Sequence, residues 1–179
     1  MSAAGTLIYL PLETSEGEFL AGYSAKGLTR LHFPQSAERH DISSTGNIPA
    51  QVRQWHRLTE RAVKAVLAGD TPDELPPLDL SSGTGFQQRV WAAMLEIKLG
   101  ATRSYGEIAA AIGNPKAVRA VGGACGANPI PVLVPCHRVL AARRKIGGFS
   151  GGLEWKVKLL TREGVQFHGA AEQLELRPQ

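Results

Sequence analysis

The sequence predicts an α/β (α+β) fold in which a small N-terminal sheet with one helix precedes a mostly helical C-terminal part. Short apolar, β-forming segments at residues 6–12, 19–24 and 28–33 are separated by turns that contain Gly17 and Gly27. Helical spacing of apolar residues then begins and recurs through much of the remaining chain. A proline-rich segment separates the two patterns, which indicates two units of different class.

The first predicted helix covers residues 51–67, and Gly69 is placed to end it. This helix should cover one face of the sheet. Residues 71–77 have the composition of a linker, because proline removes a backbone donor and holds its neighbours in extended geometry. We therefore expect a domain boundary there, with one domain at residues 1–79 and a second at residues 80–179.

The second domain begins with an apolar helical face formed by Phe86, Val90, Met94 and Ile97. Ser104 is followed three residues later by Glu107, which predicts a capping box at the start of a short helix. That helix should run through Ile112 and end at Gly113.

A second short helix should follow directly, with Asn114 as its N-cap and Pro115 at the first helical position. We expect it to continue to about Gly122, so that the two helices form a helix-turn-helix. A last helix is predicted at residues 153–162, just before Glu163.

Charge and composition limit the partners and the compartment. The net charge is +4 with a pI of 9.3, and from Arg89 to Lys158 basic residues predominate. A phosphate-facing surface should therefore be C-terminal. The chain lacks an apolar run of the ~20 residues that span a bilayer, and its two cysteines do not form a disulfide framework. We expect a cytoplasmic protein without membrane contact, in which Cys125 is structural.

The most informative stretch places Cys136 beside His137, directly after the apolar run at residues 130–134, which reads as a strand. A thiol is strongly nucleophilic only as thiolate, and a pKa of about 8.5 leaves roughly 3% ionised at pH 7. A basic neighbourhood would raise that fraction, and five nearby residues supply one: His137, Arg138, Arg143, Arg144 and Lys145. On general grounds the alternative is an inert buried cysteine, since neighbouring side chains of a strand point to opposite faces.

Several motifs in one order resemble a known family. They are residues 86–91 (FQQRVW), 104–109 (SYGEIA), 114–122 (NPKAVRAVG), 128–139 (NPIPVLVPCHRV), 148–152 (GFSGG) and 159–164 (LLTREG). Together they resemble the DNA-binding and active-site domain of the O6-alkylguanine-DNA alkyltransferases, also called methylated-DNA–protein-cysteine methyltransferases. The likeness spans roughly residues 84–164 without an obvious gap. It implies a ribonuclease-H-like N-terminal domain and a C-terminal winged helix-turn-helix that carries the active-site cysteine.

The resemblance also implies how DNA is bound. The second helix of the motif offers small residues and Arg119 as its only long polar side chain, which suits close approach to the minor groove with little sequence specificity. Arg119 aligns with the family's arginine that fills the gap left by the flipped nucleotide; a phosphate contact is the alternative. The expected DNA-binding residues are Ser104, Tyr105, Asn114, Ala117, Arg119, Ala120, Gly122 and Arg138.

For the chemistry, the resemblance implies that Cys136 accepts an alkyl group from guanine O6 after base flipping. His137 would take the thiol proton through a water, and Glu163 would orient the imidazole. Asn128 would tie the helix-turn-helix to the active-site segment, with a turn residue before proline as the alternative. Tyr105 would hydrogen-bond the base and protonate the leaving guanine. The expected base pocket consists of Tyr105, Val139, Phe149 and Ser150.

The product would be a stable thioether, so that one molecule repairs one lesion without metal or organic cofactor. The partner would be double-stranded DNA containing O6-alkylguanine, bound by a monomer, with cooperation between neighbouring molecules left open. Alternatives are a non-catalytic alkyltransferase-like lesion sensor, against which Cys136 argues, a Cys/His acyl hydrolase and a winged-helix regulator. The sequence leaves open the size of the alkyl group, repair of methylated thymine, and the roles of residues 143–145 and of the tail after Val165.

Overall fold

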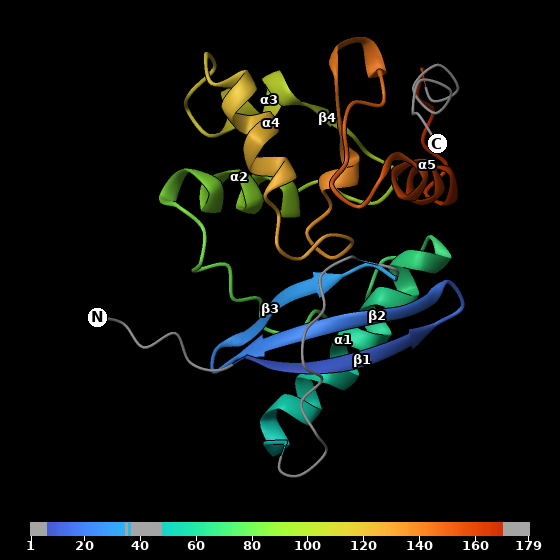
Figure 1. Cartoon of the computed structure of the whole chain (residues 1–179). Coiled ribbons are helices and arrows are strands. Elements are labelled where there is room, and N and C mark those ends of the chain that lie inside the picture. Colours follow the sequence, from blue (N-terminus) through green and yellow to red (C-terminus); the bar gives the residue numbers. More distant parts are fainter. Residues whose placement is uncertain (1–6, 35, 37–47, 170–179) are drawn as a thin grey trace.

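The structure is a computed structural model that describes residues 7–34, 36 and 48–169. Its N-terminal part is an antiparallel sheet with the strand order β1-β2-β3 (Figure 1). The strands are β1 (Ile8–Thr14), β2 (Gly17–Ser24) and β3 (Gly27–His32). The three predicted strands are thereby confirmed, although Thr6 lies outside the described residues.

One helix, α1 (Ala50–Ala68), covers one face of this sheet, as expected (Figure 1). Its apolar side chains pack against the strands, and the buried Tyr23 hydroxyl of β2 reaches it by donating to Thr59 Oγ1 at 3.0 Å. Gly69 ends the helix in the left-handed conformation, with a φ of 87° that favours glycine. The helix end is therefore where the sequence predicts it.

The C-terminal part is mostly helical and lies above the sheet in Figure 1. Its elements are α2 (Gly85–Leu95), β4 (Arg103–Ser104), α3 (Tyr105–Ala111), α4 (Val118–Gly126), η1 (Cys136–Arg138), β5 (Val139–Leu140), η2 (Ala142–Arg144) and α5 (Leu153–Arg162). The capping box of Ser104 and Glu107 is present at the start of α3, and β4 pairs in parallel with β5. The mixed α/β fold class is confirmed.

The second helix of the helix-turn-helix begins later than the sequence predicts. Asn114 is not its N-cap, because its carbonyl accepts from the Ala117 N–H at 2.9 Å and closes a turn over Pro115 and Lys116. Ala117 is the residue before α4, which continues past Gly122 to Gly126. The glycines are tolerated within the helix because Val121 and its neighbours on the same face are buried against α2 and α3.

The apolar run at residues 130–134 is not the predicted strand. It forms a buried turn in which the Val134 N–H donates to the Ile130 carbonyl at 2.9 Å. Three prolines in and around the run lack the N–H groups that a sheet ladder requires. Val132 has a φ of 75°, which an extended strand excludes. Cys136 is therefore presented by a buried turn and is the first residue of the short helix η1.

The N-terminal and C-terminal parts of the chain are held together by hydrogen bonds and by a shared apolar core. Leu28 of β3 donates to the Pro77 carbonyl at 2.8 Å and accepts from the Asp79 N–H at 2.7 Å. One core cluster of buried apolar residues runs from the sheet through α1 to α2, α4 and the turn before Cys136. The boundary at residue 79 stays a prediction. In the described part of the chain, none of the helices has the length and apolar character needed to cross a membrane.

Candidate active site

Cys136 opens η1 and is held by Asn128. The thiol is buried, with 4% of the residue exposed. The Asn128 amide Nδ2 donates to Cys136 Sγ at 3.1 Å and to the Val134 carbonyl at 2.8 Å. Its Oδ1 accepts from the Ile130 N–H at 3.0 Å. Asn128 thus fixes both the turn that precedes the cysteine and the sulfur itself.

The thiol of Cys136 is protonated at rest. Burial raises its pKa to about 11. This effect is larger than that of the hydrogen bond from Asn128 and the positive charge of Lys156, which both lower the pKa. At pH 7 the thiolate is populated on the order of one molecule in 10⁴. The basic residues of this stretch therefore do not offset the effect of burial on the thiol pKa. A nucleophilic role of Cys136 requires a group that removes the thiol proton.

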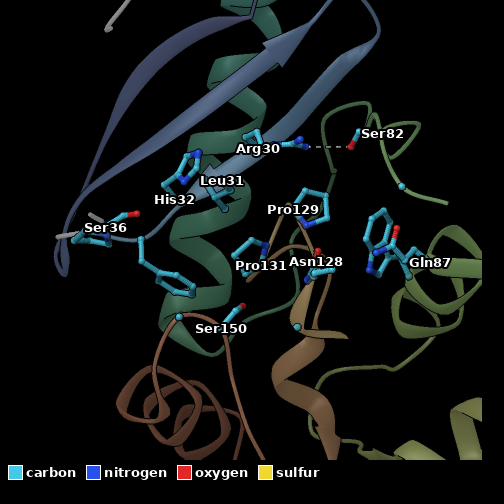
Figure 2. Close-up of a pocket in the computed structure, with 17 residues that line it drawn as sticks. Arg30, Leu31, His32, Ser36, Ser82, Gln87, Asn128, Pro129, Pro131 and Ser150 are labelled. Carbon is cyan, nitrogen blue, oxygen red and sulfur yellow. Dashed lines mark hydrogen bonds between the residues drawn. The ribbon is translucent and has the colours of Figure 1, made fainter. Parts of the chain in front are cut away.

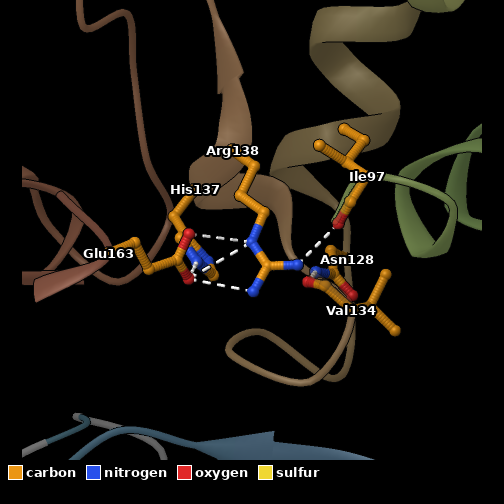
Figure 3. A network of polar contacts seen from close by, with 6 residues as sticks. All are labelled: Ile97, Asn128, Val134, His137, Arg138 and Glu163. Atoms are coloured by element: carbon orange, nitrogen blue, oxygen red, sulfur yellow. Dashed lines mark hydrogen bonds and ion pairs between the residues drawn. The ribbon is translucent and has the colours of Figure 1, made fainter. Parts of the chain in front are cut away.

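His137, the residue after Cys136, belongs to a buried polar network (Figure 3). His137 Nε2 and Glu163 Oε1 are 2.8 Å apart, and both side chains are inaccessible to solvent. Arg138 Nε donates to Glu163 Oε2 at 2.9 Å, and its Nη2 donates to Oε1 at 2.9 Å. Arg138 Nη1 donates to the Ile97 carbonyl at 2.6 Å. Glu163 follows α5 directly, and this network accounts for a carboxylate at a helix C-terminus.

The charges of this network follow from its contacts. Burial alone would raise the pKa of Glu163, but hydrogen bonds from His137 and Arg138 outweigh it and lower the pKa to about 2. Burial lowers the pKa of His137, against the opposing effect of Glu163, so the imidazole is neutral. A neutral imidazole beside an ionised carboxylate carries its proton on Nε2. Nδ1 is then the basic nitrogen, and no group of the described residues hydrogen-bonds to it.

Arg138 does not have the role expected of it. The sequence predicts a DNA contact, whereas its side chain is only 10% exposed and its guanidinium is used within the protein. A buried guanidinium paired with a carboxylate costs several kcal/mol to pull apart, since the partner is left unpaired. Arg138 is therefore a structural partner of Glu163.

Tyr105 begins α3 and lines a cavity of about 530 Å³ between the start of this helix and residues 140–144. Other residues around this cavity are Arg103, Val118, Leu140, Arg143 and Arg144. Burial, together with the nearby Cys125 and Cys136, raises the pKa of Tyr105, so its hydroxyl stays protonated. A side chain at Gly147 would place its Cβ 3.0 Å from that hydroxyl, so glycine leaves the phenol room.

The remaining residues of the expected base pocket do not meet around this cavity. Val139 is fully buried, and its carbonyl accepts from Lys156 Nζ at 2.7 Å. Phe149 stacks edge-on against Phe33 of the N-terminal part, with ring centroids 5.9 Å apart. Ser150 lines a separate cavity of about 590 Å³ between the sheet and the C-terminal part, together with Asn128 (Figure 2).

The expected DNA-binding residues other than Arg138 lie on α3, on α4 and in the segments just before these helices, and none of them is buried. Arg119, Ala120 and Asn114 are exposed, and Ala117, Gly122 and Ser104 are partly exposed. The exposed Val118 lies between them on α4. The structure therefore leaves this surface accessible, with small side chains and one arginine on it.

Sequence reasoning missed Lys156. This residue of α5 is fully buried, and its Nζ donates to the carbonyls of Val139 and Gly148 at 2.7 and 3.2 Å. Burial lowers its pKa to about 8. The available signal was its spacing, because it lies three residues after Leu153 and four before Leu160 on the apolar face of the helix.

Helix α5 also contacts the N-terminal part through its opposite face. Trp155 packs against Phe19 and Phe33, with ring centroids 5.5 and 4.9 Å apart. Glu16, in the turn between β1 and β2, forms ion pairs with Lys158 and Arg162. One helix thus holds Lys156 and Glu163 at the site and the sheet on its other side.

Comparisons with known proteins agree with this geometry. Residues 85–165 match the model of the 6-O-methylguanine DNA methyltransferase DNA-binding domain. A methylated-DNA–protein-cysteine methyltransferase of Methanosarcina acetivorans is 38% identical over 161 residues, covering 88% of this chain and 99% of that one. Its counterpart in Mycobacterium tuberculosis strain H37Rv is 54% identical over 101 residues, covering 56% and 61%.

Solved structures show the same relationship. The crystal structure of Mycobacterium tuberculosis OGT in complex with DNA matches with a TM-score of 0.72 and 39% identity, covering 87% of this chain and 91% of that one. The O6-methylguanine-DNA methyltransferase of Pyrococcus kodakaraensis matches with a TM-score of 0.59 and 25% identity, covering 89% and 100%.

The matched domain and the solved relatives place the chain in the class of DNA methyltransferases. Within that class, the chain belongs to the methylated-DNA–protein-cysteine methyltransferase family.

Proposed function

We propose that this protein repairs DNA by direct reversal. It transfers a methyl or other alkyl group from guanine O6 to its own Cys136, once per molecule. The observation that carries the proposal is the arrangement around the thiol: Asn128 holds the sulfur at 3.1 Å, and the neighbouring His137 is paired with Glu163 at 2.8 Å. A nucleophile with an adjacent, oriented base is what transfer to a protonated thiol requires.

The proposed step moves one alkyl group and one proton. The thiol proton leaves through a water to Nδ1 of His137, which Glu163 keeps available by accepting from Nε2. The Cys136 sulfur attacks the alkyl carbon, a carbon–sulfur bond forms and the carbon–oxygen bond breaks. The leaving guanine takes up a proton from Tyr105, whose raised pKa keeps the hydroxyl protonated until then. The imidazolium proton replaces it, so the net transfer is from thiol to guanine.

The base has to leave the duplex before the reaction, at a cost of a few kcal/mol. We propose that the exposed side of α3 and α4 enters the minor groove with little sequence preference, because its residues are small. Arg119, exposed on α4, would fill the gap in the base stack. Double-stranded DNA containing O6-alkylguanine is the proposed substrate, and a monomer in the cytoplasm is the proposed working form.

The product is a thioether, which thiol exchange does not open because that reaction needs a sulfur–sulfur bond. The protein is therefore a stoichiometric reagent. The proposed reaction uses only side chains and water, so it needs neither a metal ion nor an organic cofactor.

Transfer of a labelled methyl group tests the proposal. The protein is incubated with duplex oligonucleotide that carries a radiolabelled methyl on guanine O6. Label should move to the protein up to one equivalent, and peptide mapping should place it on Cys136. A Cys136→Ala variant should bind the same duplex and take up no label. Turnover beyond one equivalent, or label on the alanine variant, would contradict the mechanism.

A further inference from the structure

The loop at residues 141–145 brings two arginines to the cavity that Tyr105 lines. Arg143 and Arg144 both line it, and Arg103 of β4 contributes a third guanidinium. The one carboxylate around this cavity, Glu107, is engaged in the capping box, accepting from the Ser104 N–H at 2.7 Å and from its hydroxyl at 2.8 Å. The cavity mouth therefore has an excess of positive charge.

The two arginines of this loop that line the cavity have a strained backbone conformation. Arg143 and Arg144 have φ values of 57° and 56°, in the left-handed region that non-glycine residues rarely adopt. Such strain persists only where surrounding contacts enforce it. Within the loop, the Ala141 N–H donates to the Lys145 carbonyl at 2.8 Å.

The C-terminal segment, which the sequence leaves without a role, supplies the other contacts. Arg144 Nε donates to the Gln166 carbonyl at 2.9 Å. The His168 N–H donates to the Arg144 carbonyl at 3.0 Å, and the Ile146 N–H donates to the His168 carbonyl at 3.0 Å. Both arginines are exposed at the cavity, but these hydrogen bonds tie Arg144 back to the protein and do not involve Arg143.

We propose that Arg143 binds a DNA phosphate beside the flipped nucleotide, and that the segment at residues 166–168 holds the loop in the conformation that presents it. This inference rests on the proposed function, since the cavity of Tyr105 is then the entrance for the base. An exposed guanidinium on a fixed loop suits a phosphate through two parallel hydrogen bonds. The contact adds binding energy without reading sequence.

The salt dependence of DNA binding tests the proposal. Affinity for a fluorescent duplex is measured from about 50 to 200 mM salt, where each phosphate contact contributes about 0.9 to the slope of log affinity against log salt. Arg143→Gln should lower the slope by about one and weaken binding several-fold. Lys145→Gln is the matched control, because Lys145 is exposed in the same loop and does not line the cavity. It should leave the slope unchanged.

A second variant guards against misfolding. Arg143→Gly removes the side chain and relieves the strained φ, so it should unfold at the same or a higher temperature while losing the same slope. Equal slopes in Arg143→Gln, Lys145→Gln and the parent protein would overturn the proposal, as would equal losses in the two glutamine variants.

Methyl transfer by the parent protein, measured on the same preparation, separates this proposal from the proposed function. If label reaches Cys136 but Arg143→Gln leaves the slope unchanged, only the phosphate contact is refuted. If the slope falls as expected but no label is transferred, the contact stands and the proposed reaction is refuted.

Discussion

The surroundings of the two cysteines differ although both thiols are buried. Burial raises the pKa of Cys136 to about 11 and that of Cys125 to about 12, so neither is ionised at neutral pH. Cys125 faces another sulfur, Met94 Sδ at 3.6 Å, within the helical core. Cys136 accepts from Asn128 and lies next to His137. Burial and pKa therefore do not distinguish a nucleophile from a packing residue here, whereas the polar neighbours do.

The largest effect is expected from Cys136→Ser, which replaces the sulfur but keeps the size and the hydrogen bond of the side chain. Methyl transfer should fall to undetectable levels, because a hydroxyl is a far weaker nucleophile than a thiol at this pH. Single-turnover assays with labelled duplex measure it. Unfolding temperature and duplex affinity close to the parent values are the control, and any label on Ser at this position would contradict the expectation.

Glu163→Gln should have the next largest effect. It leaves Arg138 without a charged partner in the interior, which should cost about 3 to 5 kcal/mol of stability. Loss of the orienting carboxylate from His137 should slow transfer about 10- to 100-fold. Urea unfolding and single-turnover rates measure the two effects. Glu154→Gln, which changes an exposed carboxylate on the same helix, should change neither.

Asn128→Ala removes the amide that distinguishes the surroundings of Cys136. Its hydrogen bonds to Sγ and to the turn at residues 130–134 are lost, which should cost about 1 to 3 kcal/mol. Transfer should slow about tenfold, the factor that corresponds to one hydrogen bond of about 1.4 kcal/mol. Rates measured at saturating duplex isolate this effect from binding, and an unchanged rate would show that Asn128 only stabilises the fold.

The two thiols should be alike in their effect on alkaline stability. Folding raises both pKa values from 9.0, to about 11 for Cys136 and about 12 for Cys125. The folded state then holds protons that the unfolded state releases, so each thiol contributes stability below pH 9 that is lost as pH rises through the folded pKa. Urea unfolding between about pH 9 and 11 should show falling stability. Cys125→Ala should make that fall shallower; an unchanged dependence on pH would contradict the shift.

The smallest effect on the reaction is expected from Cys125→Ala. Removing the sulfur leaves a small cavity beside Met94 and should cost about 1 kcal/mol of stability. The transfer rate should stay within about twofold of the parent rate, because the Cys125 thiol hydrogen-bonds to Met94 Sδ and takes no part in the hydrogen bonds of His137, Glu163 and the Asn128 side chain. A larger drop would give Cys125 a part in the site.

Local sequence motifs predicted helices and strands correctly where the motif itself supplies the contacts that form the element. The capping box fixes the start of α3, and the periodicity of residues 153–162 gives α5 at its observed bounds. The predictions were wrong where one sequence pattern is compatible with two local structures. Asn114 and Pro115 are as suitable for a turn as for a helix start, and the apolar run at residues 130–134 is buried as a turn rather than as a strand.

The members of the site and the pair of His137 with Glu163 were predictable from the motifs and the resemblance, but the other contacts of Glu163 were not. The motif placed Cys136 and His137 side by side, and the family resemblance implied Glu163. That Glu163 also binds Arg138, 25 residues away, depends on how α5 packs, which no local pattern encodes. For the same reason the sequence could not show that Arg138 faces inward and that Lys156 supports the Val139 carbonyl.

Helix α5 contacts the N-terminal sheet on one face and holds Lys156 and Glu163 at the site. Gly151, just before this helix, packs so closely on Phe33 that an added Cβ would lie 2.2 Å from the ring. We therefore expect a substitution at Gly151 to displace the start of α5 and, through it, the position of Glu163. We therefore expect the residues that join the sheet to α5 to be under selection as well as Cys136; they are Phe33, Trp155 and Glu16.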